Sequence, residues 1–294
     1  MGHMLVHRVG RSVIGGILVA LLVFAGTVRA VSNVPATCGE MEISPVPGFQ
    51  PLTADTLTVV TTLPVSGFWL GSATDPEKMN AGFEYCLAKA MQAAFGLANF
   101  TVRMAGFDAL VAGTLTGYDI AITRASITDE RKKVVEFTQP YFESEQSALV
   151  KGDSDLKLST LAEAKKLQYG IQTGTTAIDL VEKWIKPEKE ARMYQNLADA
   201  YAAVDAGQID AVLIDTALNL GHAAESNGKF KVIAQFTQPG GQDLYGGILP
   251  KGSPNVQAFN SVIEELKTKG KLAELAKTQL KTDPGAIPTI KLGD

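Results

Sequence analysis

The sequence predicts an α/β protein built of two lobes that are joined by two crossing strands. Short apolar runs alternate with helical patterns from Leu57 onward, and this alternation predicts parallel sheets covered by helices. The alternation is interrupted at "SEQSALVKGDS", a strand that leads into a polar turn, and then restarts. The chain of 294 residues is long enough for two domains. Two lobes joined by two strands form a hinge, and the cleft between them is the expected ligand site.

The first thirty residues have the pattern of a secretory signal. Arg8 and Arg11 precede an apolar run, Val13 to Gly26, which is short for a membrane span, and an A-x-A-like site ends at Ala30. We expect residues 1–30 to be removed after Ala30 and the mature protein to be exported; an uncleaved anchor is the alternative. Removal lowers the Lys and Arg count from 27 to 24 against 31 Asp and Glu, a net charge of −7. A net-acidic chain argues against a nucleic-acid partner.

The first unit follows an extended, proline-rich segment over residues 31–55. Phe83, Leu87, Ala90 and Ala94 recur at the helical period and predict a helix there. The predicted strands are 57–63, 100–105 and 118–123, and the predicted helices are 82–96, 107–117 and 129–135. The division of the chain is a first lobe of residues 56–147 plus 246–294 and a second lobe of residues 148–245.

The second unit repeats the pattern. Its predicted helices are 158–166, 176–185, 197–208 and 216–228, and its predicted strands are 169–173, 191–195, 210–215 and 230–236. The expected crossing strands lie near Ser147 to Val150 and Leu244 to Leu249. Two further helices, 255–270 and 271–280, return to the first lobe, and the tail from Thr282 looks loose.

Two cysteines remain after the signal, Cys38 and Cys86. An even number of cysteines in an exported chain suggests a disulfide. A Cys38–Cys86 bridge would attach the N-terminal segment to the helix that carries Cys86. A lipid anchor at Cys38 is the alternative, although Cys38 lies well beyond the apolar run and lacks a small residue before it.

Other residue types argue against several kinds of chemistry. His222 is the one histidine outside the signal, and nothing nearby supports a Ser-His-Asp or Cys-His device. Metal-ligand spacings and glycine-rich nucleotide loops are absent from the sequence, so we expect neither a metal site nor a cofactor.

Three strand ends could build a binding site, because ligands of open parallel sheets lie beyond the carboxyl ends of the strands. Arg131 follows the first, within "SITDER". The turn "GTT" at Gly174 opens a helix whose free N–H groups favour an anion, with Thr176 and Asp179 as a candidate capping box. Asp215 ends the third. Arginine binds a carboxylate in a fork and aspartate binds an ammonium, so the set suits a zwitterion. Alternatively, Arg131 is a solvated charge and the other two features only cap helices.

The chain resembles the amino-acid-binding proteins of polar amino acid ABC transporters, solute-binding protein family 3. The resemblance rests on "GFEYCLAKA", "SITDERKKVVEFTQPYFESEQSALV", "LAEAKKLQYGIQTGTTAIDLV" and "AYAAVDAGQIDAVLID", and it spans roughly residues 56–280. It implies the type II periplasmic-binding-protein fold, with two lobes that close on the ligand.

The resemblance also implies a role for each site residue. Arg131 would clamp the α-carboxylate and Asp215 would bind the ammonium. The remaining implied contacts are Ser126 with the backbone near Thr123 and Arg124, Thr175 and Thr176 of the second lobe, the aromatic walls Phe68 or Trp69 and Phe107, and Glu84 at the side-chain end. Arg124 departs from the family, which has a small or neutral residue there. It would either reach an acidic ligand side chain or point outward to Asp129 or Glu130.

The function that follows is capture of an amino acid or related zwitterion in the periplasm, by a monomer that delivers it to an ABC-transporter permease without catalysis. An exported dehydratase of the cyclohexadienyl type is the first alternative, with Glu84 as general acid. A sensory module acting through a partner chain is the second.

Overall fold

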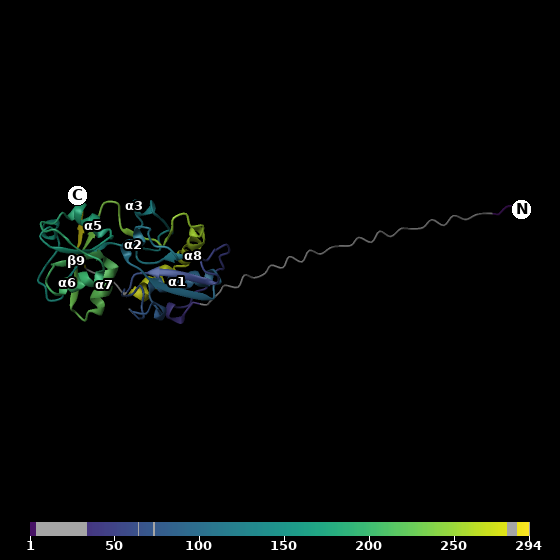
Figure 1. Ribbon diagram of the computed structural model, residues 1–294, viewed down its shortest axis with the longest axis horizontal. Helices are drawn as coiled ribbons and strands as arrows, with labels where there is room; N and C mark the ends of the chain where they lie inside the picture. Colours follow the sequence, from purple (N-terminus) through teal and green to yellow (C-terminus); the bar gives the residue numbers. More distant parts are fainter. Residues whose placement is uncertain (4–33, 64, 73, 281–286, 294) are drawn as a thin grey trace.

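The computed structural model describes residues 1–3, 34–63, 65–72, 74–280 and 287–293. The predicted signal peptide and its cleavage site lie mostly outside these residues. Within the described ranges, no helix is long and apolar enough to cross a bilayer. The chain forms two lobes side by side, one carrying α1, α2 and α8 and the other carrying α5, α6 and α7 (Figure 1).

The first lobe is built on a mixed sheet in the order β2-β1-β3-β12-β4. The first three strands are parallel, and β12 pairs antiparallel with both β3 and β4. The strands are β1 (Thr56–Thr61), β2 (Asn99–Met104), β3 (Ile120–Ala121), β4 (Val135–Phe137) and β12 (Ile248–Pro250). The helices are α1 (Phe83–Ala94), α2 (Phe107–Val111), α3 (Asp129–Lys132), α8 (Val256–Thr268) and α9 (Lys271–Leu275), with 3-10 turns at Ala36–Cys38 and Pro76–Lys78 and a π-helical end at Ala276–Leu280.

The second lobe has a sheet in the order β13-β10-β6-β9-β7-β8. Strands β7, β8 and β9 are parallel, whereas β6 runs antiparallel between β9 and β10. The strands are β6 (Gln146–Lys151), β7 (Tyr169–Gln172), β8 (Arg192–Tyr194), β9 (Ala211–Asp215), β10 (Phe230–Thr237) and β13 (Thr289–Lys291). The helices are α4 (Leu161–Ala164), α5 (Ala177–Asp179), α6 (Leu197–Asp205) and α7 (Thr216–Glu225), and a π-helical segment continues α5 over Leu180–Ile185.

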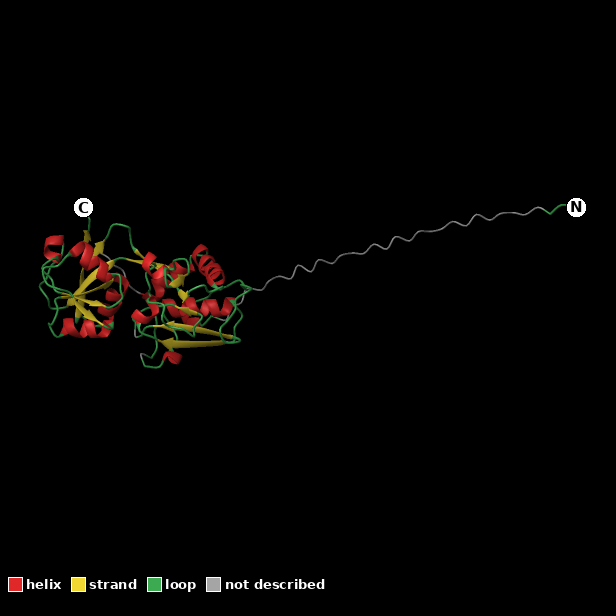
Figure 2. Cartoon of the chain, turned by 45° about the horizontal axis from the view of Figure 1, so that its top comes forward, coloured by secondary structure: helices red, strands yellow, loops and turns green. Residues whose placement is uncertain are grey.

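The lobes are connected by a two-stranded antiparallel sheet of β5 (Phe142–Ser144) and β11 (Asp243–Tyr245). Two crossing strands were expected, but the first of them was placed too late in the chain. Ser147 to Val150 lie inside β6, in the second sheet, because this run is buried on both faces and pairs with β9 and β10. Figure 2 shows the two larger sheets as separate bodies.

Two further expectations need correction. The helix expected over 129–135 ends at Lys132, and Val135–Phe137 become an edge strand whose first residue is fully buried under the sheet. The tail assigned to the first lobe instead returns to the second. Its strand β13 pairs with β10, and Ile290 and Leu292 are buried in the second core.

The N-terminal segment packs on the first lobe. Cys38 and Cys86 form a disulfide, which confirms the predicted bridge and excludes a lipid anchor on Cys38. The backbone of Ser44 donates to Glu265 of α8 at 3.0 Å, and Met41 and Ile43 are buried in the first core.

Candidate functional site

A cleft of about 700 Å³ lies between the lobes. Both lobes line it, including the following predicted site residues: Trp69, Phe107, Thr123, Arg124, Thr175 and Asp215. Five further residues predicted for the site are not among those that line the cleft: Phe68, Glu84, Ser126, Arg131 and Thr176. No cluster suited to a metal ion occurs among the described residues.

Arg131 is held in place by the short helix α3. Thr128 caps this helix by accepting from the backbone N–H of Arg131 at 3.2 Å. The guanidinium donates to the carbonyl of Ser126 at 2.6 Å and, across the cleft, to the carbonyl of Gly174 at 2.8 Å. It also lies over the ring of Phe107, 5.4 Å from its centre. Arg131 is therefore a buried side chain between the lobes, and the reading of it as a solvated charge is wrong.

The "GTT" turn brings the second lobe to Arg131. Gly174 has φ +80°, a backbone conformation that favours glycine. It also lies close to Asp108 of the first lobe. Thr175 donates to the carbonyl of Gln172 at 2.7 Å, which closes the turn. The expected capping box is wrong, because the hydroxyl of Thr176 does not cap the helix and instead donates to Asp243 at 3.1 Å.

Asp215 ends strand β9 as predicted, but its side chain does not cap α7. Its Oδ1 accepts from the amide of Gln146 at 3.1 Å. Burial raises the pKa of Asp215 well above its usual range, and the nearby carboxylate of Asp243 raises it further, whereas Arg131 opposes the shift. Arg131 interacts electrostatically with the same two carboxylates: burial lowers its pKa, whereas Asp243 and Asp215 raise it.

Arg124 neither points outward nor pairs with Asp129 or Glu130. Its guanidinium forms a 2.8 Å ion pair with Glu84, and both side chains are buried. The same group donates to the carbonyl of Thr62 at 3.2 Å, to the hydroxyl of Thr62, and to the hydroxyl of Thr123 at 3.2 Å. The charge of Arg124 is therefore neutralised inside the first lobe, which argues against selection of an acidic ligand side chain by this residue.

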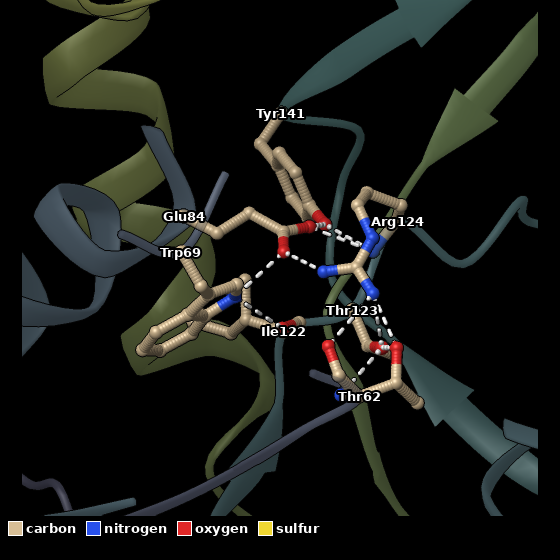
Figure 3. A network of polar contacts seen from close by, with 7 residues as sticks. All are labelled: Thr62, Trp69, Glu84, Ile122, Thr123, Arg124 and Tyr141. Carbon is tan, nitrogen blue, oxygen red and sulfur yellow. Dashed lines mark hydrogen bonds and ion pairs between the residues drawn. The ribbon is translucent and has the colours of Figure 1, made fainter. Parts of the chain in front are cut away.

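Glu84 is the centre of this network, as Figure 3 shows. Its carboxylate accepts from the indole of Trp69 at 2.8 Å, the hydroxyl of Tyr141 at 2.5 Å and the backbone N–H of Arg124 at 2.6 Å, in addition to the Arg124 guanidinium. Burial and the neighbouring Glu84 raise the pKa of Tyr141 well above its usual range. Glu84 thus positions the cleft-lining Trp69 and Arg124 from behind and does not itself line the cleft.

Phe68 also lies behind the site. It is fully buried, with its ring under Arg124 at 5.7 Å and packed edge-on against Phe83 and Phe142. Of the two aromatic residues offered as alternatives, Trp69 is the one that lines the cleft.

Sequence reasoning missed Gln146 and Asp243, which join the "GTT" turn and Asp215 into one cluster. Gln146 begins a strand that was expected to cross between the lobes, and Asp243 lies just before the other expected crossing strand. Their position could have identified them in the sequence, because polar residues at the start of strands that cross between the lobes lie near the base of the cleft.

Comparison with known proteins places the chain in a family. The profile of "Bacterial extracellular solute-binding proteins, family 3" matches residues 70–282, and the chain belongs to this family. The protein is thus a family 3 solute-binding protein with the two-lobed type II fold.

Curated relatives have related names. The chain is 32% identical over 168 residues to the "ABC transporter glutamine-binding protein GlnH" of Bacillus subtilis, covering 56% of this chain and 59% of the relative. It is 29% identical over 196 residues to "ABC transporter arginine-binding protein 1" of Escherichia coli, covering 64% and 77%. The chain thus spans less than two thirds of the length of the first of these relatives.

Solved structures agree on the fold. "An ancestral arginine-binding protein bound to glutamine" matches with a TM-score of 0.65 and 27% identity, covering 77% of this chain and 98% of that one. The "ancestral amino-acid-binding protein AncCDT-1, a precursor of cyclohexadienyl dehydratase" matches with a TM-score of 0.65 and 26% identity, covering 77% and 96%.

Proposed function

We propose that this protein binds a free amino acid, or a close zwitterionic relative, in the cleft between its lobes. One observation carries the proposal: a buried arginine and a buried aspartate, Arg131 and Asp215, lie at one interlobe site. They come from different lobes, so a ligand that satisfies both favours the closed arrangement of the lobes. Family membership and the names of the relatives support an amino acid as the ligand.

The ligand's two charged groups have separate partners in this proposal. The α-carboxylate binds Arg131 and the N–H groups of the turn at Thr175, in competition with the carbonyl of Gly174 that Arg131 contacts. The ammonium binds Asp215. Trp69 and Phe107 enclose the side chain, and Arg124 with its partner Glu84 forms a polar but neutral floor.

A dehydratase is less well supported by the geometry. That reaction needs a general acid in the cleft, and Glu84 was the candidate. Glu84 accepts four hydrogen bonds from three neighbouring residues and lies outside the cleft lining, so it is not placed to donate a proton to a ligand.

The biological setting belongs to the same proposal. The protein acts as a monomer in the periplasm, exported by the signal over residues 1–30, and delivers its ligand to the permease of an ABC transporter. The names of the curated relatives support this setting, as does the disulfide, which is typical of an oxidising compartment.

A ligand screen tests the proposal. We expect thermal-shift assays of the mature protein with the twenty amino acids, common polyamines and opines to give a clear stabilisation by at least one amino acid. A ligand at 100 times its Kd adds about 2.7 kcal/mol to the free energy of unfolding. A screen in which no amino acid stabilises the protein, or turnover of prephenate or arogenate, would contradict the assignment.

Two substitutions then test the site by calorimetric titration. Arg131→Ala and Asp215→Ala should each weaken binding by about thirty- to several-thousand-fold, because truncating one half of a buried charge pair costs roughly 2–5 kcal/mol. Lys132→Ala is the matched control, since Lys132 is the next residue of α3 but is exposed and pairs with Asp129 on the surface. Near-native affinity in both test variants would sink the site assignment.

A further inference from the structure

Asp243 is a buried carboxylate of the site to which the ligand contacts proposed above give no role. It lies on the crossing strand β11, and its Oδ2 accepts from Gln146 at 2.6 Å and from Thr176 at 3.1 Å. The same amide nitrogen of Gln146 donates to Asp215 at 3.1 Å. One nitrogen therefore bonds both acids, and the nearest oxygens of the two carboxylates lie within about 6 Å of each other.

The recorded hydrogen bonds reach one oxygen of each carboxylate. Gln146 donates to Oδ1 of Asp215, and Gln146 and Thr176 donate to Oδ2 of Asp243. The Oε1 atom of Gln146 is buried without a partner among the described residues. The hydroxyl of Tyr245 is also buried there, close to Asp215 and Ser144 but without a well-directed hydrogen bond. The cluster can therefore accept an additional proton or cationic donor.

The charged and titratable groups facing Asp215 come from three other elements. Asp243 and Tyr245 belong to β11, Arg131 belongs to α3, and Tyr201 of α6 lies near enough for Asp215 to raise its pKa. Two carboxylates and one guanidinium leave one negative charge in excess. Buried charges without partners are costly, and in the ligand-free site a proton on Asp215 removes this excess.

We propose that Asp243 is a positioning residue of the ammonium subsite: its buried negative charge beside Asp215 keeps a proton on Asp215 until the ligand's ammonium displaces that proton. The inference rests on the proposed function and adds that ligand binding releases one proton. The ammonium keeps its three hydrogens and donates to Asp215, with Gln146 Oε1 and the hydroxyl of Tyr245 as additional acceptors. The ligand enters as a neutral zwitterion whose carboxylate pairs with Arg131, and the displaced proton leaves to the solvent. Asp243 keeps its negative charge and its hydrogen bonds from Gln146 and Thr176, so charge and atoms balance.

The direction of the pH effect follows from linkage. Burial and Asp243 raise the pKa of Asp215, whereas a bound ammonium favours the carboxylate and lowers it. Between the bound and free values the free protein holds more protons, so affinity rises as pH rises and becomes level above the free value. At full linkage the change approaches tenfold per pH unit.

Calorimetry of the full mature protein tests this inference. L-Glutamine and L-arginine are titrated between about pH 5 and pH 8 in phosphate and in Tris, which differ in their heat of protonation. We expect the observed heat to depend on the buffer in the sense of proton release, and affinity to fall on acidification. In Asp243→Asn, fewer protons should be released on binding at neutral pH, and the fall of affinity on acidification should begin at a lower pH. Glu143→Gln is the matched control, because it removes an exposed carboxylate from the paired strand β5.

The outcomes separate the two proposals. Equal heats in both buffers with a flat pH profile would overturn the displaced proton on Asp215 while leaving amino-acid binding intact. An Asp243→Asn profile identical to that of the unmodified protein would overturn the role of Asp243. Binding of no amino acid would overturn the function and the inference together. The buffer comparison on the unmodified protein decides the proton question even if the variant fails to fold.

Discussion

At the scale of single residues, Arg124 is the least expected feature of the site. It has φ +55°, a backbone conformation that costs a non-glycine residue roughly 1–2 kcal/mol. The ion pair with Glu84 and the contacts with Thr62 hold it there. The strained backbone conformation of Arg124 and its ion pair with Glu84 are therefore coupled, because the backbone N–H and the guanidinium of Arg124 both donate to Glu84.

This coupling predicts a non-additive pair of substitutions. Glu84→Gln and Arg124→Gly should each lower the free energy of unfolding by about 3–5 kcal/mol, because each leaves one buried charge unpaired. The double variant should lose much less than the sum, since it removes both charges and relieves the strained backbone. Chemical denaturation of the three variants measures the coupling, and additive losses would show that the two residues act independently.

Some residues of the site could be predicted from the sequence alone. Arg131, Asp215 and the "GTT" turn were found because each follows a buried strand, and parallel strands bring their ends to one edge. The direction in which Arg124 points could not be found this way. It depends on Glu84, which is forty residues away and reaches Arg124 only after α1 has packed on the sheet.

At the scale of elements, the start of α1 is fixed by a close backbone approach. Gly82 has φ +110°, and a Cβ built on it would lie 2.3 Å from the carbonyl oxygen of Phe68. That carbonyl accepts from the backbone N–H groups of Glu84 and Tyr85, so it cannot move away cheaply.

Gly82→Ala should therefore lower the free energy of unfolding by at least about 2 kcal/mol, and it should also weaken ligand binding, since Trp69 and Glu84 adjoin the contact. Gly96→Ala is the matched control, because Gly96 has φ +67° but open space around it, and its cost should stay near 1 kcal/mol. Thermal and chemical denaturation compare the two; equal costs would show that the backbone contact at Gly82 is unimportant.

The disulfide is the second feature at this scale. It joins residues separated by 48 positions and attaches the N-terminal segment to α1. Replacing both Cys38 and Cys86 by Ala should lower stability by about 4 kcal/mol on the chain-entropy estimate for a loop of that size. Because the bridge lies outside the cleft lining, ligand affinity at a temperature where the variant is folded should stay within about twofold. A large loss of affinity measured by calorimetry would place the bridge in the binding mechanism.

The sequence was a weaker guide to element boundaries. It predicted the order of helices and strands well because buried stripes and alternating runs are local. It misplaced the first crossing strand and missed β13, because a short strand acquires its identity only from the neighbour with which it pairs.

At the scale of the whole molecule, the interlobe contacts among the described residues include one made by Arg131 and one made by Ser66. Arg131 donates to the carbonyl of Gly174. In the second contact, Ser66 donates to Glu225 at 2.5 Å, and a Cβ built on Gly221 would lie 3.1 Å from the Cβ of Ser66. This second contact joins a loop of the first lobe to α7 of the second.

The combined variant Ser66→Cys, Gly221→Cys should form a disulfide that locks the lobes together, because the Cβ separation is close to the usual range. When the variant is oxidised with ligand bound, ligand dissociation should slow about tenfold or more, and reduction should restore the normal rate. Stopped-flow measurements with the single Ser66→Cys variant as control test this. Free exchange of ligand in the oxidised double variant would show that the lobes need not separate there.

The disulfide between Cys38 and Cys86 also decides where a mechanical load would enter the molecule. Because the bridge connects the described N-terminal segment directly to α1, a tether attached before Val34 would transmit force to the first lobe and leave the second lobe unloaded. The two crossing strands would then bear none of the tension. A surface-immobilised form held by its N-terminal end should accordingly open and close as the free protein does, which makes that end the natural attachment point for a biosensor.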